Sequence, residues 1–443
     1  MKLFRFTDLF FYRINLFLCL LFISLSVIYI FSYGVSIPCY DELAIIPYFE
    51  KLFSHSLTVS DLFAQHNEHR IFFPRIVMII LGICSRYNCF AELAFVEFLF
   101  IIMFFVFYIK GGKQFDFNIN TIPLSFLIIP VLVFNWRHID NLLWGVAIIQ
   151  VLPVSSGVLS IYFIDELCNA KLSKRKKILY FICGILCSTV SSFSIMSGLI
   201  LWIVGFLQLI TRRNLSRLYI VLWTVTGISE WLLYFSGYKK PVCHPDLLYC
   251  LKEPLNFLIY FFTFAGGALF WDERTALIAG IIMFFLFLFC LLLLLADKRL
   301  QYNFFWLYIA VYSLLTALSI SIGRSGFGQS QALSSRYAHI SMLFVIAIYM
   351  MTIDLLILKK DALRKFIACF LVFIILVSVP FSYKYGADRG KEFKIKTQHW
   401  EYILLNYKSQ PDEVLKQIDP VTEEVRKGAE ILEKYKWNIF KGL

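Results

Sequence analysis

The chain has 443 residues, of which 59% are hydrophobic, 18% aromatic and only 16% charged. Soluble domains average about 25% charged residues, and a soluble core of this size cannot bury 47 Phe and 24 Tyr side chains. The composition therefore excludes a set of water-soluble globular domains. The net charge of +12 is typical of membrane proteins, whose cytoplasmic loops carry an excess of Lys and Arg, and we expect no nucleic-acid partner.

The first apolar stretch, 14–33, follows three basic residues and has no small-residue cleavage site after it, which predicts an uncleaved span with a cytoplasmic N-terminus. Basic clusters further along the chain mark cytoplasmic loops, between which the number of crossings must be even. This parity predicts an all-α, polytopic integral membrane protein with roughly eleven spans. We expect the spans at 14–33, 91–109, 121–136, 142–164, 178–192, 196–210, 218–235, 276–296, 303–322, 338–357 and 366–382.

Two apolar pieces are too short to count as spans. The piece 71–86 is interrupted by arginine, so we expect a helix that lies along the outer interface. The outer loop 236–272 ends in a short apolar piece with a Gly–Gly pair, which predicts a re-entrant segment.

The chain divides near residue 382. Residues 1–382 form the membrane body, and 383–443, which are much richer in charge, form a small helical tail on the outer side. The sequence Asp419–Pro420 is typical of the start of a helix, and the apolar pattern continues it to about Trp437.

Nearly all unusual polar residues fall on the outer face. The first outer loop, 34–74, opens with Asp41–Glu42. One interpretation is a solvated pair at the start of a loop helix, and the other is a carboxylate held at the membrane interface, within reach of a lipid headgroup.

The same loop contains His66, Asn67, Glu68, His69 and Arg70 in sequence. The spacing of the two histidines, three residues apart, could place metal ligands on one helical face, although the His–Glu–x–x–His pattern of zinc proteases is absent. A corner that binds sugar and phosphate, and a structural salt-bridge corner, are the other two interpretations.

Two later outer turns carry further polar side chains. The turn 137–141 contains His138, Asp140 and Asn141, and Trp144 follows Asn141 on the same helical face, an arrangement suited to a sugar hydroxyl and a stacking ring. The other interpretation of this turn is a structural ion pair. The turn 323–337 holds Arg324 and Arg336 beside glycines, which suits a phosphate or an anionic lipid. Cys243 and Cys250 share the outer loop 236–272, where a disulfide can form.

These features resemble a known superfamily. An N-terminal span, Asp–Glu at the head of a long outer loop and an arginine turn closed by Ser335–Arg336–Tyr337 are similar to the C-type glycosyltransferases (GT-C). Within that superfamily, the run 61–70, Asp–Leu–Phe–Ala–Gln–His–Asn–Glu–His–Arg, resembles the serotype-converting O-antigen glucosyltransferases of bacteria, phages and prophages.

The resemblance implies an inverting transfer of glucose from undecaprenyl-phosphate-glucose to lipid-linked O-antigen repeat units. The reaction would take place at the periplasmic face of the bacterial inner membrane, where the tail also lies. A small flippase and a bactoprenol glucosyltransferase are the implied functional partners. No cofactor is implied, and a divalent metal is not needed if arginines stabilise the phosphate.

The resemblance also implies roles for single residues. The first-loop acid, matched by Asp41, is the general base, with Glu42 as the open alternative. The donor phosphate is assigned to Arg336, Arg324, Arg70 and Tyr337. The sugar and the acceptor are assigned to His66, Asn67, Glu68, His69, His138, Asp140, Asn141 and Trp144.

Two other functions handle the same kind of lipid. A transporter or flippase would place ionisable residues near the bilayer midplane, whereas the expected spans hold few, mainly Glu92, Glu97, Glu230 and Asp354. An O-antigen polymerase or ligase would also use arginines on the outer face, and it differs from a glucosyltransferase in the donor it consumes.

Overall fold

The protein is an all-α, multi-pass membrane protein. The computed structural model describes residues 6–169, 172–212, 215–241 and 244–442, and within these ranges nine segments are long and apolar enough to cross a membrane. Their outer faces expose large apolar side chains, such as Phe31 at 70% and Leu232 at 71%, as expected where lipid is the solvent. The nine segments are Tyr12–Tyr33, Cys89–Phe115, Leu124–Leu143, Gly145–Leu167, Arg217–Phe235, Glu273–Ala296, Phe304–Phe327, Ser335–Leu358 and Ala362–Leu405.

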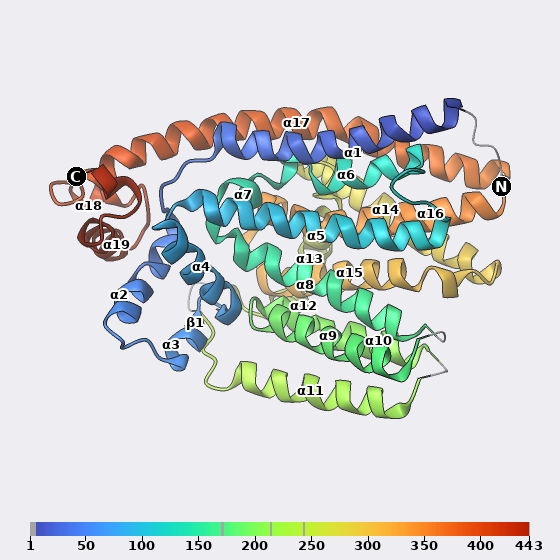
Figure 1. The fold of residues 1–443 in the computed structure, drawn as a ribbon, viewed down its shortest axis with the longest axis horizontal. Helices are drawn as coiled ribbons and strands as arrows, with labels where there is room; N and C mark the ends of the chain where they lie inside the picture. Colours follow the sequence, from blue (N-terminus) through green and yellow to red (C-terminus); the bar gives the residue numbers. More distant parts are fainter. Residues whose placement is uncertain (1–5, 170–171, 213–214, 242–243, 443) are drawn as a thin grey trace.

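The helices run roughly side by side along the long axis of the molecule (Figure 1). Helix α1 (Phe6–Tyr33) lies against α17 (Ala362–Leu405) along one side, and α11 (Arg217–Phe235) lies along the opposite edge. Between them lie α5 (Cys89–Phe115), α8 (Ile148–Leu167), α9 (Lys174–Ser192), α10 (Ile200–Ile210), α13 (Pro254–Gly266), α14 (Glu273–Ala296), α15 (Phe304–Arg324) and α16 (Ala338–Leu358).

The expected count of eleven spans exceeds the nine that the described residues provide. The two extra spans, 178–192 and 196–210, correspond to α9 and to the segment formed by η5 (Met196–Leu199) and α10. Helix α9 begins with four basic residues, Lys174–Lys177, which shorten its apolar part, and Met196–Ile210 is shorter than the other candidates. The difference therefore comes from length and charge at the helix ends.

One span is broken into short turns inside the protein. The segment Leu124–Leu143 consists of η2 (Leu124–Leu127), α6 (Ile128–Val133), η3 (Trp136–His138) and α7 (Ile139–Leu143), followed by η4 (Gly145–Ala147). It is 83% buried by its neighbours, and irregular backbone at membrane depth is tolerated only where protein surrounds it.

One end of the bundle, which we call the loop end, gathers the first loop and the tail (Figure 1). The first loop contains η1 (Tyr40–Ile45), α2 (Pro47–Phe53), α3 (Val59–Phe63), the strands β1 (Gln65–His66) and β2 (His69–Arg70), and α4 (Phe72–Ser85). The tail contributes α18 (Asp412–Leu415), α19 (Thr422–Lys434) and η10 (Asn438–Gly442). Leu43, Ile46 and Phe49 of the first loop share one buried core with Val425 and Leu432 of the tail.

The tail differs from its expected outline in two respects. Helix α17 is 44 residues long and passes without interruption through the expected boundary at 382. Helix α19 begins at Thr422, because the carboxylate of Asp419 accepts a hydrogen bond from the backbone N–H of Val421 at 2.7 Å and forms a turn before the helix. The predicted start at Asp419–Pro420 is therefore wrong by a few residues.

Short elements connect the late spans. Helix α12 (Tyr249–Lys252) precedes α13, whose short apolar stretch matches the piece expected at 256–270. The elements η6 (Leu300–Tyr302), η7 (Ser325–Phe327), η8 (Gln329–Leu333) and η9 (Ser335–Tyr337) flank α15 and lead into α16. The arginine turn expected at 323–337 is therefore a series of 3-10 turns. Cys243 lies outside the described residues.

Candidate functional site

A cavity of about 310 Å³ opens at the loop end, between the first loop and the arginine turn. Its polar lining comes from segments far apart in the sequence, and its floor is apolar, with Val146, Ile149 and Ile320. The expected site residues that line it are Asp41, His66, Asn67, Glu68, His69, Trp144, Arg324, Arg336 and Tyr337. The first outer loop and the late arginine turn therefore meet in one place.

The histidine cluster forms a tight β-hairpin. Strands β1 and β2 pair antiparallel with His66 opposite His69, and Asn67 in the turn has a φ of +49°. Asparagine tolerates this left-handed conformation better than most residues. The interpretation of two metal ligands on a helical face is therefore wrong, because the two histidines sit on paired strands.

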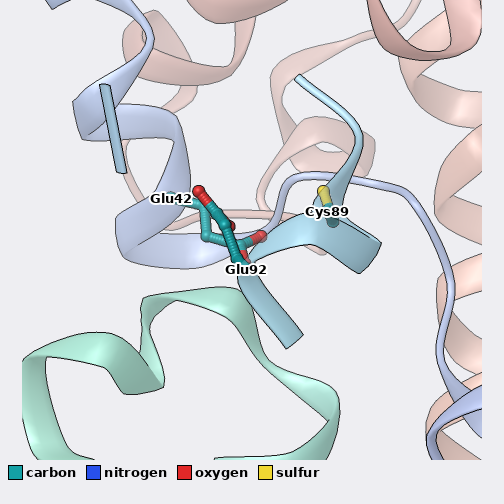
Figure 2. A group of neighbouring side chains, drawn as sticks. All are labelled: Glu42, Cys89 and Glu92. Atoms are coloured by element: carbon teal, nitrogen blue, oxygen red, sulfur yellow. The ribbon is translucent and has the colours of Figure 1, made fainter. Parts of the chain in front are cut away.

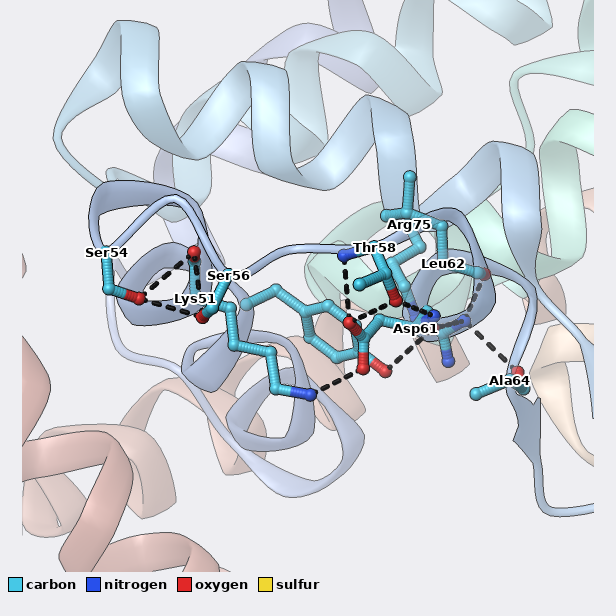
Figure 3. Close-up of polar contacts among 9 residues, drawn as sticks. Lys51, Ser54, Ser56, Thr58, Asp61, Leu62, Ala64 and Arg75 are labelled. Atoms are coloured by element: carbon cyan, nitrogen blue, oxygen red, sulfur yellow. Dashed lines mark hydrogen bonds and ion pairs between the residues drawn. The ribbon is translucent and has the colours of Figure 1, made fainter.

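The hairpin is held in place by the loop before it (Figure 3). Thr58 and Asp61 cap α3 reciprocally, and Lys51 forms an ion pair with the Asp61 carboxylate at 2.5 Å. The Arg75 guanidinium, on α4, donates to the carbonyl oxygens of Asp61 at 3.3 Å and Ala64 at 3.1 Å, and also to that of Leu62. Because Arg75 is only 2% exposed, the end of α3 is fixed to α4 immediately before the hairpin begins.

Asp41 and Glu42 point into different environments. The Asp41 side chain is 42% exposed in the cavity, and its Oδ1 lies 3.8 Å from Nε2 of His66. Burial raises the pKa of Asp41, but His66 and Arg336 outweigh it and hold the pKa below its ordinary value. Asp41 is therefore a carboxylate at neutral pH and can accept a proton.

Glu42 is 1% exposed and is absent from the cavity lining. Its Oε2 accepts a hydrogen bond from the backbone N–H of Cys39 at 2.8 Å, which caps its own turn. Burial raises the pKa of Glu42 to about 7, although backbone N–H groups, that of Cys39 first, oppose this shift. Of the two acids, only Asp41 can reach a molecule in the cavity.

The carboxylate of Glu68 lies next to one guanidinium group and two imidazole rings. Its carboxylate forms an ion pair with Arg324 and lies 3.3 Å from Nε2 of both His69 and His244. Burial, assisted by the charges of His66 and Arg336, lowers the pKa of His69 to about 3. His69 is therefore neutral, with its Nε2–H facing Glu68 and its Nδ1 accepting from the backbone N–H of Met196 at 3.4 Å.

Arg336 has no such partner. Among the described residues no carboxylate lies within ion-pair distance of its guanidinium, and its buried Nε makes no hydrogen bond. The guanidinium lies over the ring of Tyr337, 5.3 Å from its centroid. A permanently charged group that lines a cavity and pairs with no carboxylate among the described residues is suited to an anionic ligand.

Other predicted residues lie outside the cavity. Arg70 is 7% exposed and donates to the backbone oxygens of Tyr234 at 2.6 Å and Phe63 at 3.1 Å. His138 is 1% exposed, lies 3.2 Å from the Leu132 carbonyl oxygen through Nε2, and stacks on Phe100. Neither residue is available to a substrate in the cavity.

The turn 137–141 instead supports Arg336 from behind. The Asp140 backbone N–H donates to Ser335 Oγ at 3.1 Å. The Asn141 amide lies 3.4 Å from the Arg336 carbonyl oxygen and 3.1 Å from Nδ1 of His339. These two residues hold η9 in position, and only Trp144 from this region lines the cavity, with its Nε1 donating to the Cys39 carbonyl oxygen at 3.3 Å.

Two basic residues of the lining are absent from the set assigned from the sequence. Lys240 and His244 come from the loop that follows α11, which lies against the first loop through the contact between His244 Nε2 and Glu68 at 3.3 Å. Burial and the nearby Lys240 lower the pKa of His244. The polar character of 236–272 was a signal, but the loop contains no motif that separates these two residues from their neighbours.

The cavity combines a carboxylate with cationic groups above an apolar floor. Such a lining fits an amphiphilic anion whose charged head meets Arg336, Arg324 and Lys240. Asp41, ionised and partly exposed, is placed to take a proton from a hydroxyl group in the same space.

Comparison with known proteins gives one distant relative. An uncharacterized protein of Archaeoglobus fulgidus is 26% identical over 234 residues, which cover 46% of this chain and 58% of that protein. The match therefore spans less than two thirds of the relative's own length. No described protein family matches the sequence, and no solved structure matches it.

Proposed function

We propose that the protein is an inverting membrane glycosyltransferase that takes a hexose from a polyprenyl-phosphate donor. The observation that carries the proposal is that Asp41 and the two arginines, Arg336 and Arg324, line one cavity. These groups match the two needs of the reaction, which are removal of the acceptor proton and stabilisation of the charge that grows on phosphate.

In the proposed reaction the acceptor hydroxyl gives its proton to the Asp41 carboxylate. Its oxygen forms a bond to the anomeric carbon while the bond from that carbon to the phosphate oxygen breaks. The electron pair leaves with polyprenyl phosphate, whose growing negative charge Arg336 and Arg324 stabilise. A single displacement of this kind inverts the anomeric centre. The leaving phosphate needs no proton, so one base is enough.

The finer identity of the substrates follows from the resemblance of the first loop to the O-antigen glucosyltransferases. We propose undecaprenyl-phosphate-glucose as donor, lipid-linked O-antigen as acceptor, a GT-C fold, and a site on the periplasmic face of the inner membrane. Trp144, on the cavity wall, offers a ring face to the sugar. A flippase and a bactoprenol glucosyltransferase would supply the donor on that side.

The test compares two neighbouring acids of the purified full chain in liposomes that contain polyprenyl-phosphate-[14C]glucose and lipid-linked O-antigen. We expect Asp41→Asn to lower transfer by about 10²- to 10⁴-fold, the range of a lost general base. We expect Glu42→Gln to retain transfer within about tenfold, because Glu42 lies outside the cavity. Full activity of a folded Asp41→Asn variant would refute the mechanism.

The same assay separates the proposed activity from its alternatives. Mass spectrometry of the acceptor should show one added hexose per repeat unit. Movement of labelled lipid across the liposome without a new glycosidic bond would indicate a flippase, and consumption of lipid-linked repeat units as donor would indicate a polymerase or ligase.

A further inference from the structure

Five buried carboxylates lie within the candidate spans, and four of them have a clear partner. Glu166 pairs with Lys110 at 3.0 Å and with Lys113 at 2.9 Å. Glu97 accepts a hydrogen bond from Ser26 at 2.9 Å, Glu230 accepts one from Trp202 at 3.0 Å, and Asp354 pairs with Arg299 at 2.7 Å. Glu92 differs from them, because it is only 2% exposed and neither of its carboxylate oxygens meets a hydrogen-bond donor among the described residues. A buried carboxylate without any partner is costly, so a missing ligand has to be considered.

Glu92 faces two further groups that can bind a metal ion (Figure 2). Cys89 lies one turn earlier on α5, and Glu42 approaches from η1, so two separate elements meet here. Cys89 is 3% exposed and Glu42 is 1% exposed. One oxygen or sulfur atom of each of the three residues lies within 4.8 Å of the others.

The backbone of Gly145 lies directly against this group. A Cβ atom at Gly145 would fall 2.0 Å from Oε2 of Glu92 and 2.6 Å from Oε1 of Glu42. Both carboxylates therefore converge on the same stretch of backbone, where only glycine fits. The recess that Cys89 and Glu92 line on their other side is too small for a water molecule, so a water in that recess is not the missing partner.

Two candidates remain for the missing partner of Glu92: a proton that it shares with Glu42, or a bare cation. A shared proton would satisfy the two glutamates but would not involve the buried thiol of Cys89, whose Sγ accepts a weak hydrogen bond from the Asn438 amide at 3.8 Å. A cation uses all three groups, and no Lys, Arg or His forms an ion pair with Glu42 or Glu92 within the described part of the chain. Because Cys89 and Glu92 lie in the first turn of α5, the helix N-terminus offsets part of the negative charge of such a site.

We propose that Glu42, Cys89 and Glu92 bind one zinc ion in a buried structural site that ties η1 to the start of α5, with one of the two carboxylates bidentate so that four donor atoms surround the ion. Thiolate is a soft ligand and favours zinc over magnesium or calcium. Zinc ligands stand about 3.5 Å apart in a tetrahedral site, so the three atoms, now within 4.8 Å of one another, move inward by about an ångström. The site is separate from the transfer cavity, and the proposal does not depend on the proposed function.

The test measures metal in the purified full chain by inductively coupled plasma mass spectrometry, after growth with added zinc. We expect about one zinc per wild-type chain, and a loss of at least about fivefold in Cys89→Ser and in Glu92→Gln. Cys84→Ser is the matched control, because Cys84 is an exposed cysteine on α4, just before Cys89 in the sequence. It should keep the wild-type zinc content.

A second measurement needs no variant. Wild-type protein stripped with a chelator and loaded with Co²⁺ should show the near-ultraviolet charge-transfer band of a cobalt–thiolate bond, and added zinc should remove it. Wild-type protein that carries no zinc and takes up none on direct titration would overturn the proposal, and the two glutamates would then share a proton. Zinc retained in Cys89→Ser, or lost equally from Cys84→Ser, would overturn it as well.

Discussion

Replacement of Arg336 by alanine tests the anion site where the structure makes the clearest distinction. Its guanidinium lines the cavity and forms no ion pair with a carboxylate among the described residues. A charge-assisted hydrogen bond to phosphate contributes about 1.5–3 kcal/mol, which corresponds to a loss of about 10- to 150-fold in kcat/KM. Because Arg336→Ala breaks no internal ion pair, the thermal stability should change little.

The assay is transfer of labelled hexose in liposomes, paired with thermal unfolding of each variant. Arg336→Lys keeps the charge but loses the planar fork, so its activity should lie between wild type and alanine. Arg324→Ala should lose both activity and stability, because Glu68 is then left without its arginine. Arg389→Ala, an exposed arginine that pairs with Glu392 on α17, should change neither. A folded Arg336→Ala variant whose transfer activity is within about twofold of wild type would refute the assignment of this arginine.

Three further predictions concern the groups around the cavity. The pKa of His69 is about 3 in the folded protein and about 6.5 in the unfolded chain. Because the unfolded chain takes up the proton first as the pH falls, the free energy of unfolding should fall by about 2 kcal/mol between about pH 7 and about pH 5, and His69→Gln should flatten this pH dependence in thermal unfolding. Asn141→Leu removes the amide behind Arg336 and should cost about 1–3 kcal/mol of stability together with a fall in kcat/KM, whereas unchanged kinetics would contradict its positioning role. Deletion of 407–443 exposes the core that Leu43 shares with Leu432, and limited proteolysis should then cut the first loop faster than in the intact chain.

The sequence predicts well those features that depend on composition and local order. Apolar length and charge indicate an all-α membrane protein, and the pieces at 71–86 and 256–270 correspond to short helices that differ from spans. The number of spans is less certain from sequence, because α9 and α10 differ from true spans only by a few residues of length and charge.

Some residues of the candidate site could also be predicted from the sequence, whereas others depend on how the loops fold. Asp41, His66 and Arg336 were assigned from motifs and do line one cavity. Arg70 and His138 belong to the same motifs but turn toward backbone carbonyl oxygens, because a short loop places neighbouring side chains on opposite sides. The choice between Asp41 and Glu42 could not be made from two adjacent letters, since it depends on the turn that buries Glu42 against Gly145.

The tail explains how the first loop keeps its shape next to a lipid surface. Helix α17 has 44 residues and is about 66 Å long at 1.5 Å per residue, roughly twice the thickness of a bilayer core. Its later part therefore stands outside the apolar layer, where Lys396 donates to the Tyr40 hydroxyl at 2.9 Å. Beyond it, the Ile418 carbonyl oxygen accepts the backbone N–H of Tyr40 at 3.3 Å. Since Tyr40 immediately precedes Asp41, these two contacts with the tail hold the proposed base in position from outside the apolar layer, and loss of either contact would move Asp41 away from the arginines.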